Sequence, residues 1–473
     1  MYMGGFKRTK IVCTIGPASH SVAKLKAMMK AGMNVCRLNF SHGSHADHRK
    51  LVRNIRKAAD EVDVTVSILQ DLSGPKMRVG DMGDGVKLKK GSTVVFSSDA
   101  KNKKALHVKY PYLERDIKPG NRILLDDGTK EVEVLSVRKT GVTCKVIIGG
   151  TLKSNKGFNL PGAKLSISSI TEKDKKDLVL GLSQKVDFVA LSFVRSARDI
   201  NRLRAMVKKG WKKSDGIVPA IIAKVEKPEA LQDIEKIVRA VDGIMVARGD
   251  LGIETPAAGV PVAQKHIIDL CRAAGKQVIV ATEMLASMVD RPRPTRAEVS
   301  DVANAVIDHA DAVMLSGESA TGAYPVQAVS IMADIARETE HSKYDDIGIC
   351  ETGDVSMKTH RRVGALVGVL AQRGDVSAVL VSPVASDLLP QVVFFRPEVP
   401  LIVGHENQRV LAQANLRSGV YALPKVSKSQ DGFLKHVREY AKRVGVKQSD
   451  TVAMIHKKGF GLDLHVGRLK DIY

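Results

Sequence analysis

Side chains of opposite charge stand two positions apart at the ends of two short apolar runs. Lys224 precedes Glu226 at the first run, and Arg248 precedes Asp250 at the second. Carboxylates from two neighbouring strands could bind one hard divalent cation, and the absence of nearby Cys or metal-spaced His favours Mg2+ or Mn2+ over zinc. The carboxylates could instead pair with Lys224 and Arg248, and the alternation of charge supports both interpretations equally.

Polar side chains also follow six other apolar runs. In chain order they are Gly16 and Pro17; Arg37, Asn39, Ser41 and His42; Asp71, Lys76 and Arg78; Ser192 and Arg195; Thr282 and Glu283; and Ser316 and Glu318. A helix cap or a paired surface charge is a sufficient explanation for any one of them. Together they mix cations with carboxylates, which is the combination required to hold a divalent metal beside a phosphate.

Eight apolar runs of strand length lie in the first 320 residues, with helix-like stretches between them. They are Lys10–Ile15, Asn34–Leu38, Thr65–Leu69, Asp187–Leu191, Val218–Ala223, Gly243–Val246, Gln277–Ala281 and Ala312–Leu315. Continuous apolar runs are typical of parallel strands covered on both faces, and eight strand-then-helix units are the content of a (β/α)8 barrel. Active sites of such barrels lie at the C-terminal ends of the strands, so we expect the polar side chains above to converge on one mouth.

Helix signals occur between these runs. Thr295 and Glu298 have the spacing of a capping box, and Gly32 follows a helix-like stretch as a C-terminal stop. Both signals fit helices that alternate with the strands of a barrel.

The stretch of residues 76–164 interrupts the alternation of strand and helix. It is rich in turn sequences and in alternating runs such as Lys130–Val137, and it predicts a small inserted β-barrel. It holds 19 Lys and Arg against 9 Asp and Glu, a net charge of +10. We interpret it as a basic lid over an anionic ligand, although a solvated basic surface has the same composition.

Three domains follow from this organisation. The predicted barrel comprises residues 1–75 and 165–340, and the lid comprises residues 76–164. A helix and further apolar runs predict an α/β domain of regulatory type over residues 341–473. This agrees with the length of 473 residues, at about 150 residues per domain.

Composition limits the classes of function. No apolar run approaches the roughly 18 residues that a membrane-spanning helix needs. The five cysteines are scattered and lack a C-x-x-C pattern, which indicates neither a disulfide framework nor a zinc site. We therefore expect a cytoplasmic protein without a membrane partner.

The net charge of +23 would attract polyanions, including nucleic acids and phosphorylated substrates. Aromatic residues make up only 4% of the chain and no dense basic run occurs, so stacking of exposed bases is disfavoured. Phosphorylated small molecules fit the composition better than nucleic acid does.

Seven segments of the predicted barrel form an ordered series. They are Cys13–Ser19 (CTIGPAS), Arg37–Gly43 (RLNFSHG), Ser73–Arg78 (SGPKMR), Ala223–Glu226 (AKVE), Met245–Gly252 (MVARGDLG), Ala281–Leu285 (ATEML) and Met314–Glu318 (MLSGE). The series closely resembles the pyruvate kinase family. Chance agreement over so many ordered segments is negligible.

The resemblance implies transfer of a phosphoryl group from phosphoenolpyruvate to ADP, giving ATP, and protonation of the enolate to pyruvate. It assigns Glu226 and Asp250 to the divalent ion, Mg2+ or Mn2+. It assigns Lys224 and Arg37 to the phosphoryl group, which a compact ammonium can stabilise. The amides around Gly249 and Asp250 are expected to bind the substrate carboxylate.

The remaining roles also come from the resemblance. Thr282, with Ser316 and Glu318, corresponds to the face on which the enolate is protonated, and a threonine hydroxyl is a weak enough acid that we expect a relay through water. The residues that correspond to nucleotide contacts are Arg78, Lys173, His42 and Pro17.

Lys76 departs from the family pattern. Many members need a bound K+ and have a glutamate at this position, whereas Asn39, Ser41 and Asp71 match the other K+ ligands. An ammonium at this place could supply the same unit charge, worth roughly 4 kcal/mol at ~4 Å and an effective dielectric of ~20. We therefore expect that K+ is not required.

The C-terminal domain resembles the family less closely. Ser382–Asp387 lies where activated members bind a phosphate of fructose 1,6-bisphosphate, but it lacks the glycine and contains Pro383, which has no N–H to donate. Another small anionic effector would have Arg396, Arg409 and Lys457 as candidate ligands, for which surface charge is the simpler explanation. The family resemblance also implies a homotetramer.

Two other functions compete with this hypothesis. Another Mg2+-dependent enolate barrel, such as a phosphoenolpyruvate mutase or lyase, would not need a basic lid, because its reaction uses no nucleotide. A nucleic-acid-binding protein that keeps the barrel as a scaffold would explain the net charge of +23. Tight ADP binding would argue against the first alternative, whose reaction uses no nucleotide. RNA binding without turnover would favour the second.

Overall fold

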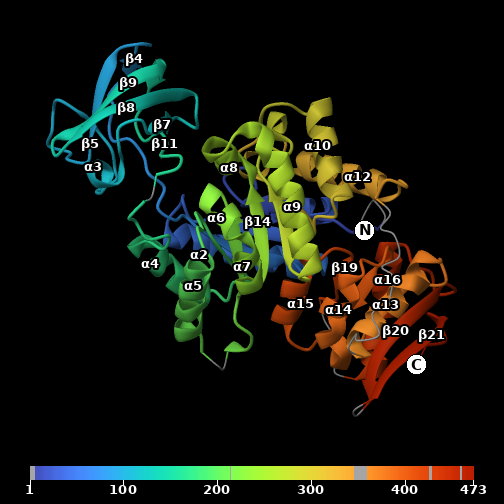
Figure 1. Cartoon of the computed structure of the whole chain (residues 1–473). Coiled ribbons are helices and arrows are strands. Elements are labelled where there is room, and N and C mark those ends of the chain that lie inside the picture. The colour runs from blue at the N-terminus through green and yellow to red at the C-terminus, as the bar shows by residue number, and fades with distance from the viewer. Residues whose placement is uncertain are drawn as a thin grey trace.

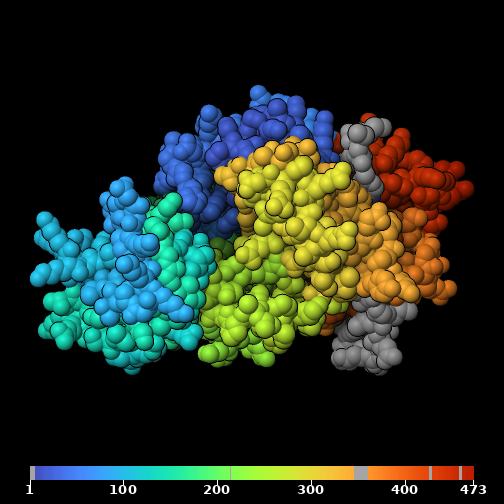
Figure 2. Space-filling model, turned by 90° about the horizontal axis from the view of Figure 1, so that it is seen from above, coloured from blue at the N-terminus to red at the C-terminus, as the bar shows by residue number. Residues whose placement is uncertain are grey.

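The computed structural model describes residues 6–163, 165–212, 215–345, 359–424, 429–458 and 461–472. Cys350 and most of the polar stretch that follows the predicted barrel lie outside these ranges. The described part of the chain has three lobes, and Figures 1 and 2 show residues 76–163 at one side of the central barrel and the C-terminal lobe at the other.

The central lobe is a closed ring of eight parallel strands in the order β1-β16-β15-β14-β13-β12-β3-β2. The strands are β1 (Lys10–Thr14), β2 (Val35–Asn39), β3 (Ser67–Leu72), β12 (Phe188–Leu191), β13 (Ala220–Val225), β14 (Gly243–Ala247), β15 (Gln277–Ala281) and β16 (Ala312–Leu315). The predicted (β/α)8 barrel is therefore confirmed, with every predicted run in the ring.

Helices surround the ring (Figure 1). They are α1 (Val22–Ala31), α2 (His45–Val62), α4 (Glu172–Ser183), α5 (Ala197–Gly210), α6 (Pro228–Gln232), α7 (Ile234–Ala240), α8 (Arg248–Glu254), α9 (Val260–Ala273), α10 (Arg296–Ile307), α11 (Gly317–Ala320) and α12 (Pro325–Glu340). The capping box of Thr295 and Glu298 begins α10, and Gly32 ends α1 at a φ of 125°, a conformation that costs other residues a steric clash. Among the described residues, none of the helices combines the length and apolar character needed to cross a bilayer.

Two strands end two or more residues later than the apolar runs predict. β3 ends at Leu72 and β13 at Val225, so that Asp71 and Lys224 lie inside strands and not after them. Both side chains are buried, at 1% and 8% exposure. An apolar run ends at a charged residue, and the sequence does not show that the charges of Asp71 and Lys224 are paired inside the fold.

The insert between β3 and α4 has its own apolar core. Its elements are β4 (Val86–Leu88), β5 (Thr93–Ser97), β6 (Leu106–His107), α3 (Leu113–Asp116), β7 (Arg122–Leu125), β8 (Lys130–Arg138), β9 (Gly141–Ile148), β10 (Gly150–Leu152) and β11 (Phe158–Asn159). They pair as a six-stranded sheet, β11-β7-β8-β9-β5-β6, and a two-stranded sheet, β10-β4. The sequence predicts a small β-barrel. The insert consists mostly of strands, with the short helix α3, and its strands form two open sheets within the described residues and not a closed ring.

The C-terminal lobe is a sheet of five strands in the order β19-β18-β17-β20-β21. Its elements are α13 (Thr359–Gln372), β17 (Ala378–Val381), α14 (Leu389–Phe394), β18 (Leu401–Val403), α15 (Gln408–Ala414), β19 (Val420–Ala422), α16 (Gln430–Ala441), β20 (Thr451–Lys458) and β21 (Gly461–Arg468). The four predicted runs are strands, and β21 is an additional antiparallel edge strand. Its sequence is too polar to be recognised as an apolar run.

The loop between α15 and β19 closes the N-terminal end of the barrel. Leu416 is fully buried and belongs to the apolar cluster that fills the ring. Beside it, Asn415 Nδ2 donates to Asn34 O and Thr65 O, each at 3.0 Å, and Gln413 Nε2 donates to Val218 O at 2.8 Å. The C-terminal lobe thus supplies hydrogen-bond donors to carbonyl groups at the N-terminal ends of the barrel strands. Without these donors the carbonyl groups would be buried with no hydrogen bond.

Leu416→Ala is expected to destabilise the barrel by about 2–5 kcal/mol, because it opens a cavity in an apolar layer that is otherwise filled. The measurement is the denaturant midpoint of the barrel, followed by far-UV circular dichroism. Leu366→Ala, at a leucine that is 50% exposed on α13, is the matched control. Equal midpoints for the two variants would contradict the role of Leu416 as a core residue.

Candidate active site at the barrel mouth

A buried ion network joins the neighbouring strands β13, β12, β3 and β2 at the C-terminal end of the barrel. Lys224 Nζ lies 2.9 Å from Glu226 Oε1 and 3.3 Å from Asp71 Oδ1, and it donates to Ser192 Oγ at 2.8 Å. Arg37 Nε donates to Asp71 Oδ2 at 2.7 Å. Each of these side chains belongs to a residue at most 8% exposed. The strands therefore bring residues from positions 37 to 226 into direct contact, as the sequence predicts.

The side chains of the network keep one another in their charged forms. Burial acts to lower the pKa of Lys224, and the charges of Asp71 and Glu226 outweigh it, so that this pKa is raised. Burial acts to raise the pKa of Asp71, and Lys224 and Arg37 outweigh it, so that this pKa is lowered. Lys224 is consequently an ammonium, and Asp71 a carboxylate, at neutral pH.

The two carboxylate oxygens of Glu226 have different partners. Its Oε2 accepts a hydrogen bond from the backbone N–H of Phe193 at 2.7 Å. Its Oε1 is buried and, despite the nearby Lys224, accepts no hydrogen bond of acceptable geometry. Burial raises the pKa of Glu226, Lys224 opposes this, and the charge of Asp250 raises it again, which places the two carboxylates within electrostatic reach of each other.

This pair of carboxylates fits a hard divalent cation. Hard cations prefer oxygen ligands, and the buried Oε1 of Glu226, which has an ion-pair partner but no hydrogen bond, is an oxygen that such a cation would bind. No group of three or more His, Cys, Asp or Glu suited to a metal occurs among the described residues. A cation at Glu226 and Asp250 would therefore complete its coordination with water or with substrate oxygens, as Mg2+ does at phosphate sites.

The segments after β14 and β15 meet at a strained threonine. Gly249 N, in the first turn of α8, donates to Thr282 Oγ1 at 2.7 Å. Thr282 has a φ of 71°, which is unfavourable for a β-branched residue and is found where surrounding contacts impose it. The contacts that impose this conformation hold the threonine hydroxyl beside the N–H of Gly249, at the start of α8.

Arg248 supports this loop and does not pair with Asp250. Its Nη2 donates to Thr282 O at 2.7 Å, and its Nη1 donates to Asp301 Oδ1 at 2.6 Å. Asp250 lies instead 3.7 Å from the ammonium of Lys76. Of the two ion pairs that the sequence allows, Lys224–Glu226 is present and Arg248–Asp250 is not.

Ser316 and Glu318 follow β16 but differ in how they are engaged. Glu318 is 2% exposed, and its two carboxylate oxygens accept from the backbone N–H groups of Leu285 and Ser316 at 3.1 and 2.7 Å. Ser316 Oγ is buried without a hydrogen-bond partner. Glu318 thus joins the loops after β15 and β16, while the serine hydroxyl stays available.

Four cations from three segments act on the loop that follows β2. Burial lowers the pKa of His42, and four neighbouring cations lower it further; they are Arg78, Lys76, Arg37 and Lys173. The positive electrostatic potential of these cations disfavours protonation of His42. The same potential favours binding of an anion. In this loop Ser41 N donates to Asn39 Oδ1 at 3.1 Å.

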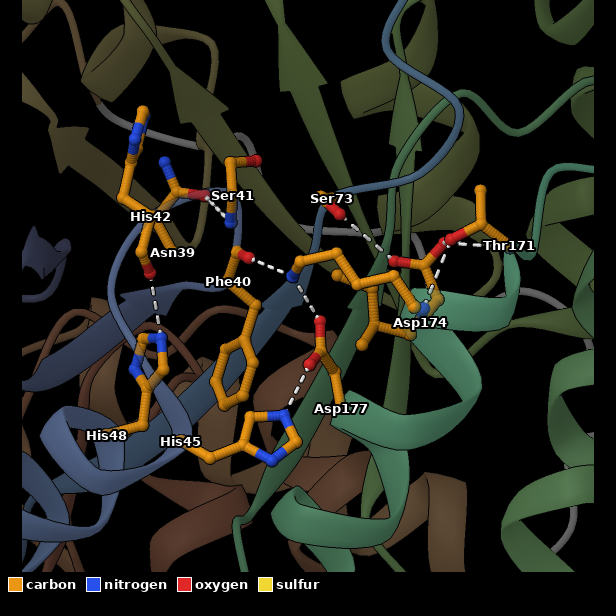
Figure 3. Close-up of polar contacts among 12 residues, drawn as sticks. Asn39, Phe40, Ser41, His42, His45, His48, Ser73, Thr171, Asp174 and Asp177 are labelled. Atoms are coloured by element: carbon orange, nitrogen blue, oxygen red, sulfur yellow. Dashed lines mark hydrogen bonds and ion pairs between the residues drawn. The ribbon is translucent and has the colours of Figure 1, made fainter.

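Helix α4 packs its first turns against the same loop (Figure 3). Lys173 Nζ donates to Phe40 O and to Asp177 Oδ2, each at 2.6 Å, and His45 points at Asp177 from the other side. The predicted nucleotide residues Lys173 and His42 therefore lie on adjacent segments. Pro17 stands apart, exposed, with its carbonyl 2.9 Å from a ring nitrogen of His20.

The C-terminal candidates for an anionic effector are all engaged by the protein itself. Arg396 Nη1 lies 3.1 Å from Asp311, Arg409 donates to Val186 O at 2.8 Å, and Lys457 pairs with Asp387. Two of the three are not surface charges, because Arg409 is buried and the side chain of Arg396 is only 11% exposed where the C-terminal lobe meets the barrel. Pro383 begins a short 3-10 helix, in place of the turn that would present N–H groups to a phosphate.

Sequence reasoning assigned no role to several residues of the site. Ser192 contacts Lys224, and Thr14 Oγ1 accepts from Arg37 Nη1 at 2.8 Å. Asp177, which lies between Lys173 and His45, was not singled out either. The signal for Ser192 was its position after β12, whereas Thr14 and Asp177 act inside a strand and a helix, where sequence position carries no such signal.

Comparisons with known proteins show the family to which the chain belongs. Residues 6–329 match the family described as "Pyruvate kinase, barrel domain". The chain is 45% identical over 458 residues to the pyruvate kinase of Geobacillus stearothermophilus, an alignment that covers 95% of this chain and 77% of that protein. It is 44% identical over 425 residues to pyruvate kinase 2 of Synechocystis, covering 88% and 70% of the two chains.

A third relative is matched over a larger share of its own length. The chain is 43% identical over 437 residues to a pyruvate kinase of Agrobacterium vitis, which covers 91% of this chain and 88% of that protein. The chain is an enzyme of the phosphotransferase class and belongs to the pyruvate kinase family.

Proposed function

We propose that this enzyme transfers the phosphoryl group of phosphoenolpyruvate to ADP, giving pyruvate and ATP in the last step of glycolysis, with a divalent metal. The observation that carries the proposal is the buried ammonium of Lys224, which stands between the carboxylates of Asp71 and Glu226. A fixed cation in a water-poor site stabilises negative charge that develops on transferring and enolate oxygens.

Arg37 and Lys224 would bind the phosphoryl group together. Both are held by Asp71, so their positions are set before the substrate arrives. Such preorganisation lowers the barrier because no cation has to move as the charge shifts. The amides around Gly249 and Asp250, at the start of α8, would bind the substrate carboxylate, and the N–H of Gly249 would have to leave Thr282 Oγ1 to do so.

Glu226 and Asp250 would hold Mg2+ or Mn2+. When bound there, the ion would polarise the carboxylate and enolate oxygens of the substrate and offset their charge. The residues of the chain fix the ion's place, since Glu226 is itself anchored by the N–H of Phe193.

Protonation of the enolate would take place on the side of Thr282. Its hydroxyl accepts from Gly249 N and donates to Ala281 O, so its own proton is not free in this geometry. Ser316 Oγ has no partner and could hold a water molecule. We therefore propose a relay through water, with Glu318 fixing the loops that carry Thr282 and Ser316.

The nucleotide would lie between the barrel mouth and the insert. Lys173, His42 and Arg78 are the proposed contacts, with Pro17 at the edge of the same mouth. The basic insert, residues 76–164, would close over the phosphates and exclude water, which prevents hydrolysis of the phosphoryl group. Residues 1–75 and 165–340 would then be the catalytic domain and residues 341–473 the regulatory domain of a cytoplasmic homotetramer.

Lys76 would replace the monovalent cation. Its ammonium lies 3.7 Å from Asp250 and is one of the cations that act on His42, so it stands between the metal carboxylates and the nucleotide loop. Asp71, in contrast, is neutralised by Arg37 and Lys224. A covalently attached charge at this place would make K+ unnecessary.

Phosphoenolpyruvate and ADP with Mg2+ should give pyruvate in an assay coupled to lactate dehydrogenase. Lys224→Met should lower kcat by about 100-fold or more, because a single preorganised charge in such sites is worth that much. Absence of turnover in the wild-type protein would disprove the proposal. Strong, salt-dependent RNA binding without turnover would favour the nucleic-acid alternative.

Removal of the divalent ion with EDTA should abolish turnover, and added Mg2+ or Mn2+ should restore it. Glu226→Gln should raise the metal concentration for half-maximal rate by about tenfold or more, because it removes a charged ligand. Glu235→Gln, at an exposed glutamate on α7, is the control and should leave the metal titration unchanged. Full activity in EDTA would contradict the assignment of the metal site.

Activity should be the same in tetramethylammonium buffer with and without K+. Lys76→Met should lower the rate by about tenfold or more in that buffer, because it removes a unit charge from the mouth. Stimulation of the wild-type enzyme by K+ would show that Lys76 does not substitute for the ion. Unchanged activity of Lys76→Met would show that the charge is not needed.

A further inference from the structure

Asp177 is a buried carboxylate whose oxygens both serve side chains at the nucleotide loop. Its side chain is 2% exposed, whereas Lys173 and His45, which it contacts, are 55% and 42% exposed. Oδ2 accepts from Lys173 Nζ at 2.6 Å, and Oδ1 lies 2.7 Å from His45 Nε2. The contacts join α4 to the first turn of α2, as Figure 3 shows for His45 and Asp177.

The ammonium of Lys173 has one donor left for a ligand. An ammonium has three N–H groups, and those of Lys173 reach Asp177 Oδ2 and Phe40 O. The remaining donor can bind a phosphate oxygen without breaking either contact. A flexible lysine side chain is thus held, before the ligand arrives, beside the cations that surround His42.

The neighbouring Asp174 has a different task, which sets Asp177 apart. Asp174 Oδ2 accepts from Thr171 in the capping box of α4, and its Oδ1 accepts from Gly74 N at 3.1 Å, where the chain leaves β3 for the insert. Asp177 accepts nothing from the backbone through its carboxylate among the described contacts. Its charge is buried in order to hold two side chains, and such burial is costly unless the charge is paired.

We infer that Asp177, fixed by His45, is a positioning residue that orients Lys173 for the phosphates of the nucleotide. The inference rests on the proposed function, because it takes ADP as the ligand of Lys173. It extends that function by naming the carboxylate that makes a solvent-exposed lysine a defined phosphate ligand. His45 contributes by occupying the oxygen that Lys173 does not use.

Asp177→Asn tests the inference through the Michaelis constants. The KM for ADP should rise by about tenfold, because the free lysine regains rotamer freedom that binding must then remove. The KM for phosphoenolpyruvate and the kcat at saturating ADP should change less than about twofold. The hydrogen bond from Gln70 of β3 reaches the backbone carbonyl of Asp177, which the substitution keeps, and the Asp177 carboxylate contacts Lys173 and His45. Lys175→Gln, which breaks an exposed ion pair with Glu172 on the same helix, is the control and should alter none of these values.

A double-mutant cycle shows whether Asp177 acts through Lys173. In the background of Lys173→Met, the change Asp177→Asn should leave the KM for ADP unchanged, because the side chain it orients is gone. An equal increase in both backgrounds would overturn the inference, and so would an unchanged or lower KM for ADP in the single variant. His45→Leu should give a smaller increase than Asp177→Asn, and His45→Gln, which can still donate to the carboxylate, should restore part of it.

The outcomes separate this inference from the function on which it rests. A wild-type enzyme without turnover disproves the proposed function, whereas an active wild type with a normal KM in Asp177→Asn disproves only the role of Asp177. If Asp177→Asn fails to fold, the pair Lys173→Met and Lys173→Met/Asp177→Asn provides the comparison, because the double variant buries no unpaired charge. Equal KM values for that pair support the inference, and unequal values overturn it.

Discussion

The structure depends on one interaction: the ammonium of Lys224 held between the carboxylates of Asp71 and Glu226 below the barrel mouth. Removing one partner would leave a buried charge without compensation, which is strongly destabilising. The ion pair of Lys224 with Asp71 therefore connects β13 to β3 and also positions the ammonium for catalysis. Stability and function share these side chains, and neither can be altered alone.

The barrel could be predicted from the sequence because its strands are apolar and its helices carry caps. The apolar runs end too early at β3 and β13, because these strands continue through the charged residues Asp71 and Lys224. It also missed β21, whose side chains are mostly outside the core. Apolar patterns report burial of hydrocarbon, and they do not report charges that are buried in pairs.

The site was predictable as a set of positions but not as a set of contacts. The strand ends indicated that Lys224, Glu226 and Arg37 converge, and the structure brings them together. Adjacent charges nonetheless point to different partners, since Arg248 binds Asp301 while Asp250 faces Lys76. Such choices depend on backbone direction at each strand end, which a linear spacing does not contain.

The loop that carries Leu416 has a consequence for the order in which the protein is made. The lowest layer of the barrel core contains a residue that lies more than 100 positions after the last barrel strand, Ala312–Leu315. A nascent chain that has emerged only as far as β16 lacks Leu416, and the carbonyl groups that Asn415 and Gln413 bind stay exposed to water. The barrel becomes complete only when most of the C-terminal lobe has left the ribosome, so for this chain maturation of the first domain waits for synthesis of the last.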